Sequence, residues 1–284
     1  MKRILQVITL SLLALFLVAC GNKNGEEDKQ SAEKVKVAVV GSKEKELWEY
    51  VAEKAKKENI DLEVVELNDY NQPNQALVNG SVDMNAFQHY AFLKQWNEES
   101  GENVVPIGLT FITPLYIFSD KIDSLDDLPE NGQVIVPIET AIQGRALLAL
   151  QTAGVIKLKD GGSTQSSLAD ITENPKNIEF VEVESAQAPR MIQDVDAAVL
   201  NGGFAEDAGL AIEDNIFTDA DYLDTIPADR YNLIAVREED KDNETYRKIV
   251  DLYNSDDVAE KMDEISPGQY YPVWERADEV DFLE

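Results

Sequence analysis

The 284-residue chain contains a single cysteine, Cys20, and a single histidine, His89. One cysteine excludes an internal disulfide, and one histidine leaves a zinc site without the several ligands it needs. Basic residues are also scarce: 25 lysines and arginines stand against 55 acidic residues, which gives a formal net charge of −30. Nucleic-acid binding depends on phosphate neutralisation by lysine and arginine. We therefore expect no cofactor, no metal and no nucleic acid as a partner.

The chain also lacks the short motifs of several large enzyme classes. It has no Gly-x-Ser-x-Gly nucleophile elbow, no phosphate-binding loop and no Gly-x-Gly-x-x-Gly dinucleotide fingerprint. A histidine-based catalytic triad could use only His89. Carboxylate pairs stay open as a catalytic device, because acidic residues occur throughout. These absences favour a binding protein, and we predict that the chain is not an enzyme.

Long apolar runs are missing except at the N-terminus. Residues 8–19 are largely apolar, follow Lys2 and Arg3, and end at Cys20. A basic start, an apolar stretch too short to span a bilayer comfortably and a small residue before a cleavage point are typical of a secretory signal. The ending Leu-Val-Ala-Cys resembles the lipobox of bacterial lipoproteins, in which cleavage leaves a lipid-modified cysteine at the N-terminus.

We therefore expect a signal peptide at residues 1–19 and a lipidated Cys20. A diacylglycerol together with an N-acyl group such as palmitate would supply the several acyl chains that stable anchoring requires. Residues 20–33 have no apolar pattern and are expected to form a flexible tether. The protein would then be lipid-anchored at the extracytoplasmic face of the cell membrane. An uncleaved N-terminal anchor is the alternative.

The mature chain alternates strand and helix patterns. β-branched runs at 35–40 and 62–67 flank an amphipathic helix predicted over 43–59. This order indicates a parallel sheet with right-handed crossovers. Extended segments at 111–119, interrupted by Pro114, and at 231–236 are interpreted as crossings between two α/β lobes. We predict one lobe from residues 34–115 and 229–284, and a second from 116–228.

Residues 134–150 combine a strand, a loop and a helix. Pro137 closes the β-branched run, Leu147 and Leu150 supply an apolar helical face, and Gly154 is a plausible helix stop. A helix N-terminus carries free N–H groups and partial positive charge. The guanidinium of Arg145 adds a donor fork that matches a carboxylate. We predict that this corner holds the carboxylate of a small ligand, with a surface ion pair as the alternative.

Three predicted strand ends would face a cleft between the lobes, where ligands of such sheets bind. Tyr70 and the pair Phe87 and His89 follow strands of the first lobe, and Arg145 or Asn201 belongs to the second. Each has a simpler interpretation: a structural histidine, core phenylalanines, or a turn at Asn201.

Several dispersed stretches between about residues 35 and 236 closely resemble one family, the NlpA/MetQ lipoproteins, substrate-binding components of methionine ABC importers. The stretches are Asn68-Asp69-Tyr70-x-Gln72-Pro73-Asn74-x-Ala76-Leu77, Phe87-Gln88-His89, Ser124-Leu125-Asp126-Asp127-Leu128-Pro129, Gly144-Arg145-Ala146-Leu147-Leu148, Glu173-Asn174-Pro175-Lys176-Asn177, Ala188-Pro189-Arg190 and Asp194-Val195-Asp196-Ala197-Ala198-Val199-Leu200-Asn201-Gly202. The resemblance implies a two-lobed, type II periplasmic-binding-protein-like α/β fold. It also implies a monomer that binds an amino acid, methionine, and hands it to a membrane permease and its ATPase.

The resemblance also implies roles for particular residues. Arg145 and Asn201 would hold the amino-acid backbone, Phe87, His89 and Phe92 would line the side-chain pocket, and Tyr70 would lie nearby.

The chain departs from the family pattern at five positions. Phe92 stands where a tyrosine is usual, and Ile138, Ile142, Phe111 and Thr113 replace more polar residues. Another hydrophobic amino acid or a short peptide is therefore an alternative ligand, and a lipoprotein adhesin is the alternative class.

Overall fold

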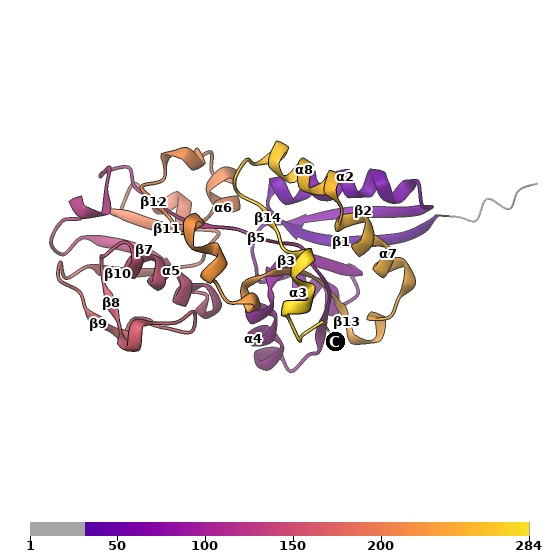
Figure 1. Cartoon of the computed structure of the whole chain (residues 1–284), viewed down its shortest axis with the longest axis horizontal. Helices are drawn as coiled ribbons and strands as arrows, with labels where there is room; N and C mark the ends of the chain where they lie inside the picture. Colours follow the sequence, from indigo (N-terminus) through magenta and orange to yellow (C-terminus); the bar gives the residue numbers. More distant parts are fainter. Residues whose placement is uncertain (1–31, 284) are drawn as a thin grey trace, which may run out of the picture. The chain divides into compact units, whose positions relative to one another are not determined.

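The computed structural model describes residues 32–283. The predicted signal peptide, the lipidation of Cys20 and nearly all of the predicted tether lie outside these residues. The body that follows, from Glu33 onward, contains two five-stranded sheets (Figure 1).

The first sheet has the strand order β2-β1-β3-β13-β4. β1 pairs in parallel with β2 and β3, whereas β13 runs antiparallel to β3 and β4. Its strands are β1 (Glu33–Val40), β2 (Ile60–Leu67), β3 (Met84–His89), β4 (Val104–Leu109) and β13 (Asn232–Arg237), and its helices are α2 (Ser42–Lys56), α3 (Gln72–Val78), α4 (Tyr90–Ser100), α7 (Glu244–Tyr253) and α8 (Asp256–Ile265).

The second sheet has the order β10-β7-β11-β6-β12. Strands β10, β7 and β11 run parallel to one another, and β6 is antiparallel to β11. Its elements are β6 (Leu115–Phe118), β7 (Gln133–Pro137), α5 (Thr140–Thr152), β10 (Glu179–Val183), β11 (Ala197–Asn201), α6 (Gly202–Asp207) and β12 (Phe217–Thr218). Two small ladders complete the strands, β5 (Phe111–Ile112) with β14 (Tyr271–Pro272) and β8 (Lys157–Leu158) with β9 (Ile171–Glu173).

Each sheet is buried on both faces, which explains the near-continuous apolar runs of its central strands. In β1, Val35, Val37 and Val39 pack in the cluster that contains α2, α7 and α8, while Ala38 joins the cluster on the opposite face. β7 is divided in the same way, with Val134 in one cluster and Ile135 in the other. The strand ends are therefore left as the places where polar side chains can gather.

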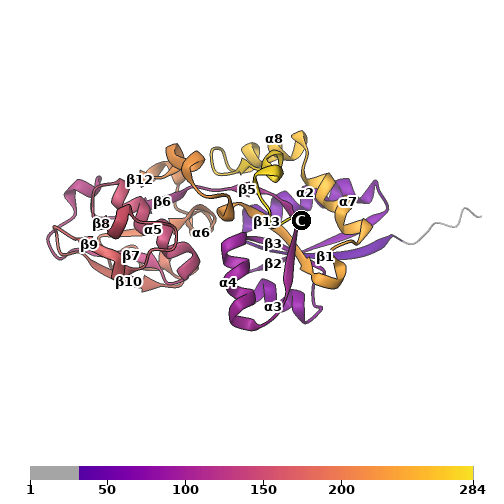
Figure 2. The ribbon, with the colours of Figure 1, turned by 60° about the horizontal axis from the view of Figure 1, so that its bottom comes forward.

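The chain passes between the sheets at the predicted crossings. Pro114 separates β5 from β6, as predicted, and a later segment returns into β13 (Figure 2). The helical region near the C-terminus is broken at Ser255, which precedes α8. The predicted residue boundaries of the lobes, 115/116 and 228/229, stay predictions.

The helix predicted over 43–59 is α2, which spans Ser42–Lys56. It ends before Asn59, which takes a left-handed backbone conformation with φ of 61°. The segment near Pro189 forms only the short 3-10 turn Ala188–Met191.

α6 begins at Gly202. Another side chain approaches this glycine closely, since a Cβ atom at Gly202 would lie 1.9 Å from Oε1 of Gln269.

Candidate functional site

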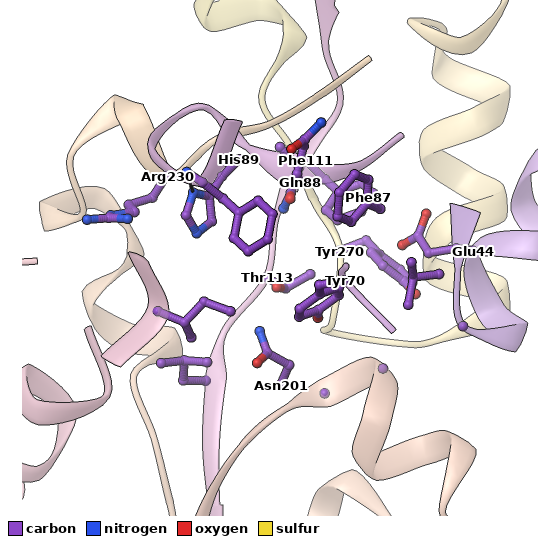
Figure 3. Close-up of a pocket in the computed structure, with 18 of the residues that line it drawn as sticks. Glu44, Tyr70, Phe87, Gln88, His89, Phe111, Thr113, Asn201, Arg230 and Tyr270 are labelled. Atoms are coloured by element: carbon purple, nitrogen blue, oxygen red, sulfur yellow. Dashed lines mark hydrogen bonds between the residues drawn. The ribbon is translucent and has the colours of Figure 1, made fainter. Parts of the chain in front are cut away.

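A cavity lies where the polar ends of the two sheets meet (Figure 3). All six predicted ligand-binding residues line it: Tyr70, Phe87, His89, Phe92, Arg145 and Asn201. The first four come from the ends of β2 and β3 and the start of α4, while Arg145 belongs to α5 and Asn201 ends β11. The structure therefore brings together every residue that the sequence singled out for the site.

Arg145 is a buried member of the cavity wall, with 8% of its surface exposed. Its Nε donates to Oδ2 of Asp219 over 2.8 Å, and its Nη2 donates to Oδ1 of Asp219 and to the carbonyl oxygen of Thr113, both over 2.9 Å. Within residues 32–283, Nη1 has no hydrogen-bond partner. The ion pair left open by the sequence therefore exists, but it is buried, and it leaves one edge of the guanidinium free.

α5 begins at Thr140, so Arg145 lies one turn inside the helix. Ala141 and Ile142, in the first turn, line the cavity as well. The partial positive charge of the helix N-terminus and the guanidinium therefore reach the cavity from successive turns of one helix.

Asn201 is the residue that joins β11 to α6. Its Oδ1 is buried without a hydrogen-bond partner among the described residues, and a buried unpaired carbonyl oxygen is costly. Asn232, the first residue of β13, lines the same cavity and was missed by the sequence interpretation. The sequence did contain a signal for Asn232, because this residue lies at the start of the strand predicted at 231–236, which returns from one lobe to the other.

The apolar part of the wall is a set of aromatic rings. The ring centroids of Phe87 and Phe92 are 5.8 Å apart, and Tyr70 lies 6.0 Å from Phe87 and 6.2 Å from Phe92. Tyr70 also contacts Phe204 of α6 at 4.8 Å, which connects the rings of the first sheet to the second. These are ordinary separations for tilted and edge-to-face aromatic pairs.

A network of buried amides supports the end of β3. The side chain of Gln88 bonds reciprocally with that of Asn74 at 2.8 and 2.7 Å, and Asn85 joins both at 2.9 and 3.0 Å. All three side chains are at most 3% exposed. Because the amides satisfy one another, they fix β3 and with it the positions of Phe87 and His89.

His89 caps the N-terminus of α4. Its Nδ1 accepts the backbone N–H of Phe92 at 3.1 Å. Burial lowers the pKa of His89 well below its usual value, and the charges of Arg230 and Arg145 lower it further. The imidazole is therefore neutral, and its proton is on Nε2. The structural interpretation of the lone histidine and the pocket interpretation are both compatible with this position.

Arg230 is a second arginine in the wall, and no sequence motif indicated it. It ends the short turn Ala228–Arg230 that precedes β13, and only 1% of its surface is exposed. Nη1 donates to the carbonyl oxygen of Ala141 over 2.6 Å, and Nη2 donates to that of Thr164 over 2.8 Å. The side chain therefore connects the returning crossing segment to α5.

Glu44, from α2, is an acidic residue in the cavity wall, 9% exposed. Burial raises its pKa to about 8; a hydrogen bond with Tyr270 lowers it and the nearby Glu206 raises it. At neutral pH this carboxyl group is mostly protonated. The wall therefore combines cationic residues with a largely neutral acid.

α6 contacts the first sheet's helices next to the cavity. The carboxylate of Asp207 accepts the backbone N–H of Ser42, at the start of α2, over 3.1 Å and also the hydroxyl of Ser42. Glu206 Oε1 accepts the hydroxyl of Ser266 over 2.6 Å. A carboxylate at a helix N-terminus is favourably placed, so these bonds hold the second sheet's helix against the first.

The part of the chain that the structure describes contains no group of three or more histidine, cysteine or acidic side chains placed to hold a metal ion. Over the same residues, no helix is both long and apolar enough to cross a membrane.

Two sheets with flanking helices are joined by crossing segments, and a small cavity lies between their strand ends. This arrangement defines the two-lobed periplasmic-binding-protein type of substrate-binding protein. The model of the NlpA lipoprotein family matches residues 35–274, and the chain belongs to this family. The fold class and the family predicted from the sequence are therefore confirmed.

Similar proteins of described function and similar solved structures support this assignment. The chain is 40% identical over 269 residues to the D-methionine-binding lipoprotein MetQ of Salmonella typhi, covering 92% of this chain and 94% of the relative. A nutrient-binding protein from Burkholderia cenocepacia, solved bound to methionine, is 40% identical, with a TM-score of 0.78 and coverage of 84% and 99%. The substrate-binding protein of a methionine transporter from Streptococcus pneumoniae is 36% identical, with a TM-score of 0.77 and coverage of 85% and 96%.

Proposed function

We propose that this protein binds methionine between its two lobes and delivers it to an ABC importer. The observation that carries the proposal is a cavity in which an aromatic wall meets the free Nη1 edge of Arg145 and the unpaired Oδ1 of Asn201. Nη1 can donate to a carboxylate, and Oδ1 can accept from an ammonium group. The names of the relatives supply methionine as the amino acid.

The rings suit the methionine side chain. A thioether gains roughly 0.3–1.5 kcal/mol from a contact with an aromatic ring, and Phe87, Phe92 and Tyr70 surround one part of the cavity. The cavity volume is about 90 Å³. That size favours a single amino acid over a peptide.

The departures from the family pattern divide into two groups. Phe92, Phe111, Thr113 and Ile142 line the cavity, whereas Ile138 does not and is 50% exposed. The four lining residues make the wall more apolar, which keeps another hydrophobic amino acid as the alternative ligand. Ile138 has no bearing on ligand choice in this arrangement.

Transport requires partners and a location beyond the described residues. We propose a lipid-anchored monomer outside the cytoplasmic membrane that presents its closed, loaded form to a permease driven by an ATPase. The family assignment as lipoproteins supports the anchor. The protein itself acts by binding and catalyses no reaction.

The direct test of the ligand is mass spectrometry of small molecules that co-purify with the protein lacking residues 1–32. Thermal shifts with L-methionine, D-methionine, leucine and methionine-containing dipeptides complete it. We expect methionine to be recovered and to raise the melting temperature most. Recovery of another amino acid, or a larger shift with a dipeptide, would contradict methionine as the ligand.

Asn201→Ala is expected to weaken methionine binding about tenfold, because a buried hydrogen bond to a charged group contributes roughly 1.5–3 kcal/mol. Arg190→Ala is the comparison, since Arg190 is exposed and outside the cavity. It is expected to change the dissociation constant less than twofold in isothermal titration calorimetry. The opposite order of effects would show that the ligand binds elsewhere.

Closure of the lobes is proposed as the way in which ligand binding is signalled, because a ligand that contacts both lobes favours the closed form. Asp207 tests this without touching the cavity. Asp207→Ala removes the bonds to Ser42 and is expected to weaken binding severalfold, since the closed form loses a charge-assisted hydrogen bond. Small-angle scattering of the ligand-free variant should show a larger radius of gyration. Unchanged affinity would contradict a role for this contact in closure.

A further inference from the structure

We propose that Arg230, rather than Arg145, supplies most of the net positive charge that attracts the carboxylate of the ligand. The inference rests on the proposed function, in that it assumes an amino-acid ligand in this cavity. It assigns different tasks to the two guanidinium groups of the wall. Arg145 orients the ligand carboxylate by donating a hydrogen bond from Nη1, and Arg230 attracts the carboxylate by its positive charge.

The charge of Arg145 is already balanced within the protein. The carboxylate of Asp219 accepts hydrogen bonds from Nε and Nη2 of Arg145 over 2.8 and 2.9 Å. The side chain of Arg145 is 9% exposed and that of Asp219 is 6% exposed. A bidentate pair shielded from water in this way is close to neutral when seen from the cavity. An approaching carboxylate would meet the negative charge of Asp219 together with the positive charge of Arg145.

Arg230 has no comparable partner. Its two terminal nitrogens donate to the neutral carbonyl groups of Ala141 and Thr164. Oδ1 of Asp229 lies 3.5 Å from Nε in an ion pair that includes no hydrogen bond, and this Oδ1 is itself buried without a hydrogen-bond partner among the described residues. Nε is buried and has no hydrogen-bond partner in residues 32–283.

The burial of this guanidinium is therefore unfavourable until an anion arrives. Burial lowers the pKa of Arg230, and Arg145 lowers it further, while Asp229 offsets only part of the loss. A buried cation that forms no hydrogen bond with a carboxylate is incompletely compensated, and this destabilises the protein. A ligand carboxylate near Arg230 would remove this unfavourable contribution, and binding would be more favourable by that amount.

The position of Arg230 makes one side of the cavity more positive than the other. Figure 3 shows Arg230 beside His89 at one side of the cavity and Glu44 at the opposite side. Arg230 also holds the carbonyl of Ala141, in the first turn of α5, so the positive helix end lies at the same side. In a chain with a net charge of −30, this is the local positive region that an anionic group needs.

The test compares two ligands that differ only in their carboxylate. Dissociation constants for methionine and for methioninamide, which keeps the amino group and side chain, are measured by calorimetry for the unmutated protein and for Arg230→Gln. We expect Arg230→Gln to weaken methionine binding about 10- to 100-fold, the effect of one charged interaction, and methioninamide binding less than about threefold. The matched control, Arg190→Gln, is expected to change neither constant.

Arg230→Lys separates charge from structure. Lysine keeps the positive charge but cannot donate to both carbonyl groups in the geometry of a guanidinium. It is expected to retain most of the preference for methionine over methioninamide, even if its melting temperature falls. Equal loss of both ligands in Arg230→Gln, or loss of the preference in Arg230→Lys, would overturn the proposal and show a purely structural role.

The same measurements separate this inference from the proposed function. If the unmutated protein fails to bind methionine but binds another amino acid, methionine is wrong as the ligand. The comparison is then made with that amino acid and its amide. If Arg230→Gln keeps full preference for the carboxylate form, the assignment of charge to Arg230 is wrong while the transport role is untouched.

Discussion

Arg145→Ala is expected to weaken methionine binding about 10- to 100-fold and also to destabilise the protein. The ligand loses a charge-assisted hydrogen bond that contributes roughly 1.5–3 kcal/mol. Asp219 is left buried, with 6% of its side chain exposed, and loses both guanidinium hydrogen bonds. Breaking a buried ion pair in this way costs about 3–5 kcal/mol. Calorimetry measures the affinity, and urea unfolding measures the stability.

The double variant Arg145→Ala/Asp219→Ala separates the two losses. Removing the carboxylate as well removes the unpaired buried charge, so part of the lost stability should return. The affinity should not return, because the donor to the ligand is still missing. An Arg145→Ala variant with an unchanged dissociation constant would refute the role of this residue in binding. Attachment to cells that survives Arg145→Ala would instead favour the adhesin alternative.

The sequence predicted the fold well because its strands are buried on both faces. The run 134–136 is apolar at every position and 35–40 at every position except Lys36, which distinguishes them clearly from the amphipathic helices. Pro114 marked a real interruption for a reason that is local to the backbone. The close approach of Gln269 to Gly202 could not be predicted, because Gln269 lies far along the chain.

The site was predictable where residues follow strands. Tyr70, His89 and Asn201 each come directly after or at the end of a strand, and parallel strands bring such ends together. Asp219 and Arg230 lie in short turns without a motif, so only the folded chain shows that one neutralises Arg145 and the other enters the wall. Charge balance within the cavity therefore could not be predicted, although the six residues chosen from the sequence all line it.

The burial of Glu44 has the second large expected effect, on the dependence of stability on pH. The pKa of Glu44 is about 8 in the folded protein against 4.5 for the free group, chiefly because of burial. Between these values the folded protein holds a proton that the unfolded chain has released. The free energy of unfolding therefore falls as pH rises from about 4.5 to about 8, by about 5 kcal/mol from this group.

Glu44→Gln is expected to remove most of that fall, because glutamine has nearly the same shape and does not titrate. Urea unfolding at several pH values should give a free energy that decreases by several kcal/mol less than in the unmutated protein, with the largest gain in stability near pH 8. Part of the slope should persist, because burial also raises the pKa of Glu206, which lies on α6. Glu49→Gln is the matched control, since Glu49 lies on the same helix and is exposed. If Glu44→Gln and Glu49→Gln show the same slope as the unmutated protein, Glu44 is ionised in the folded state. The acidic side of the cavity would then carry a charge able to bind the ammonium group of the ligand.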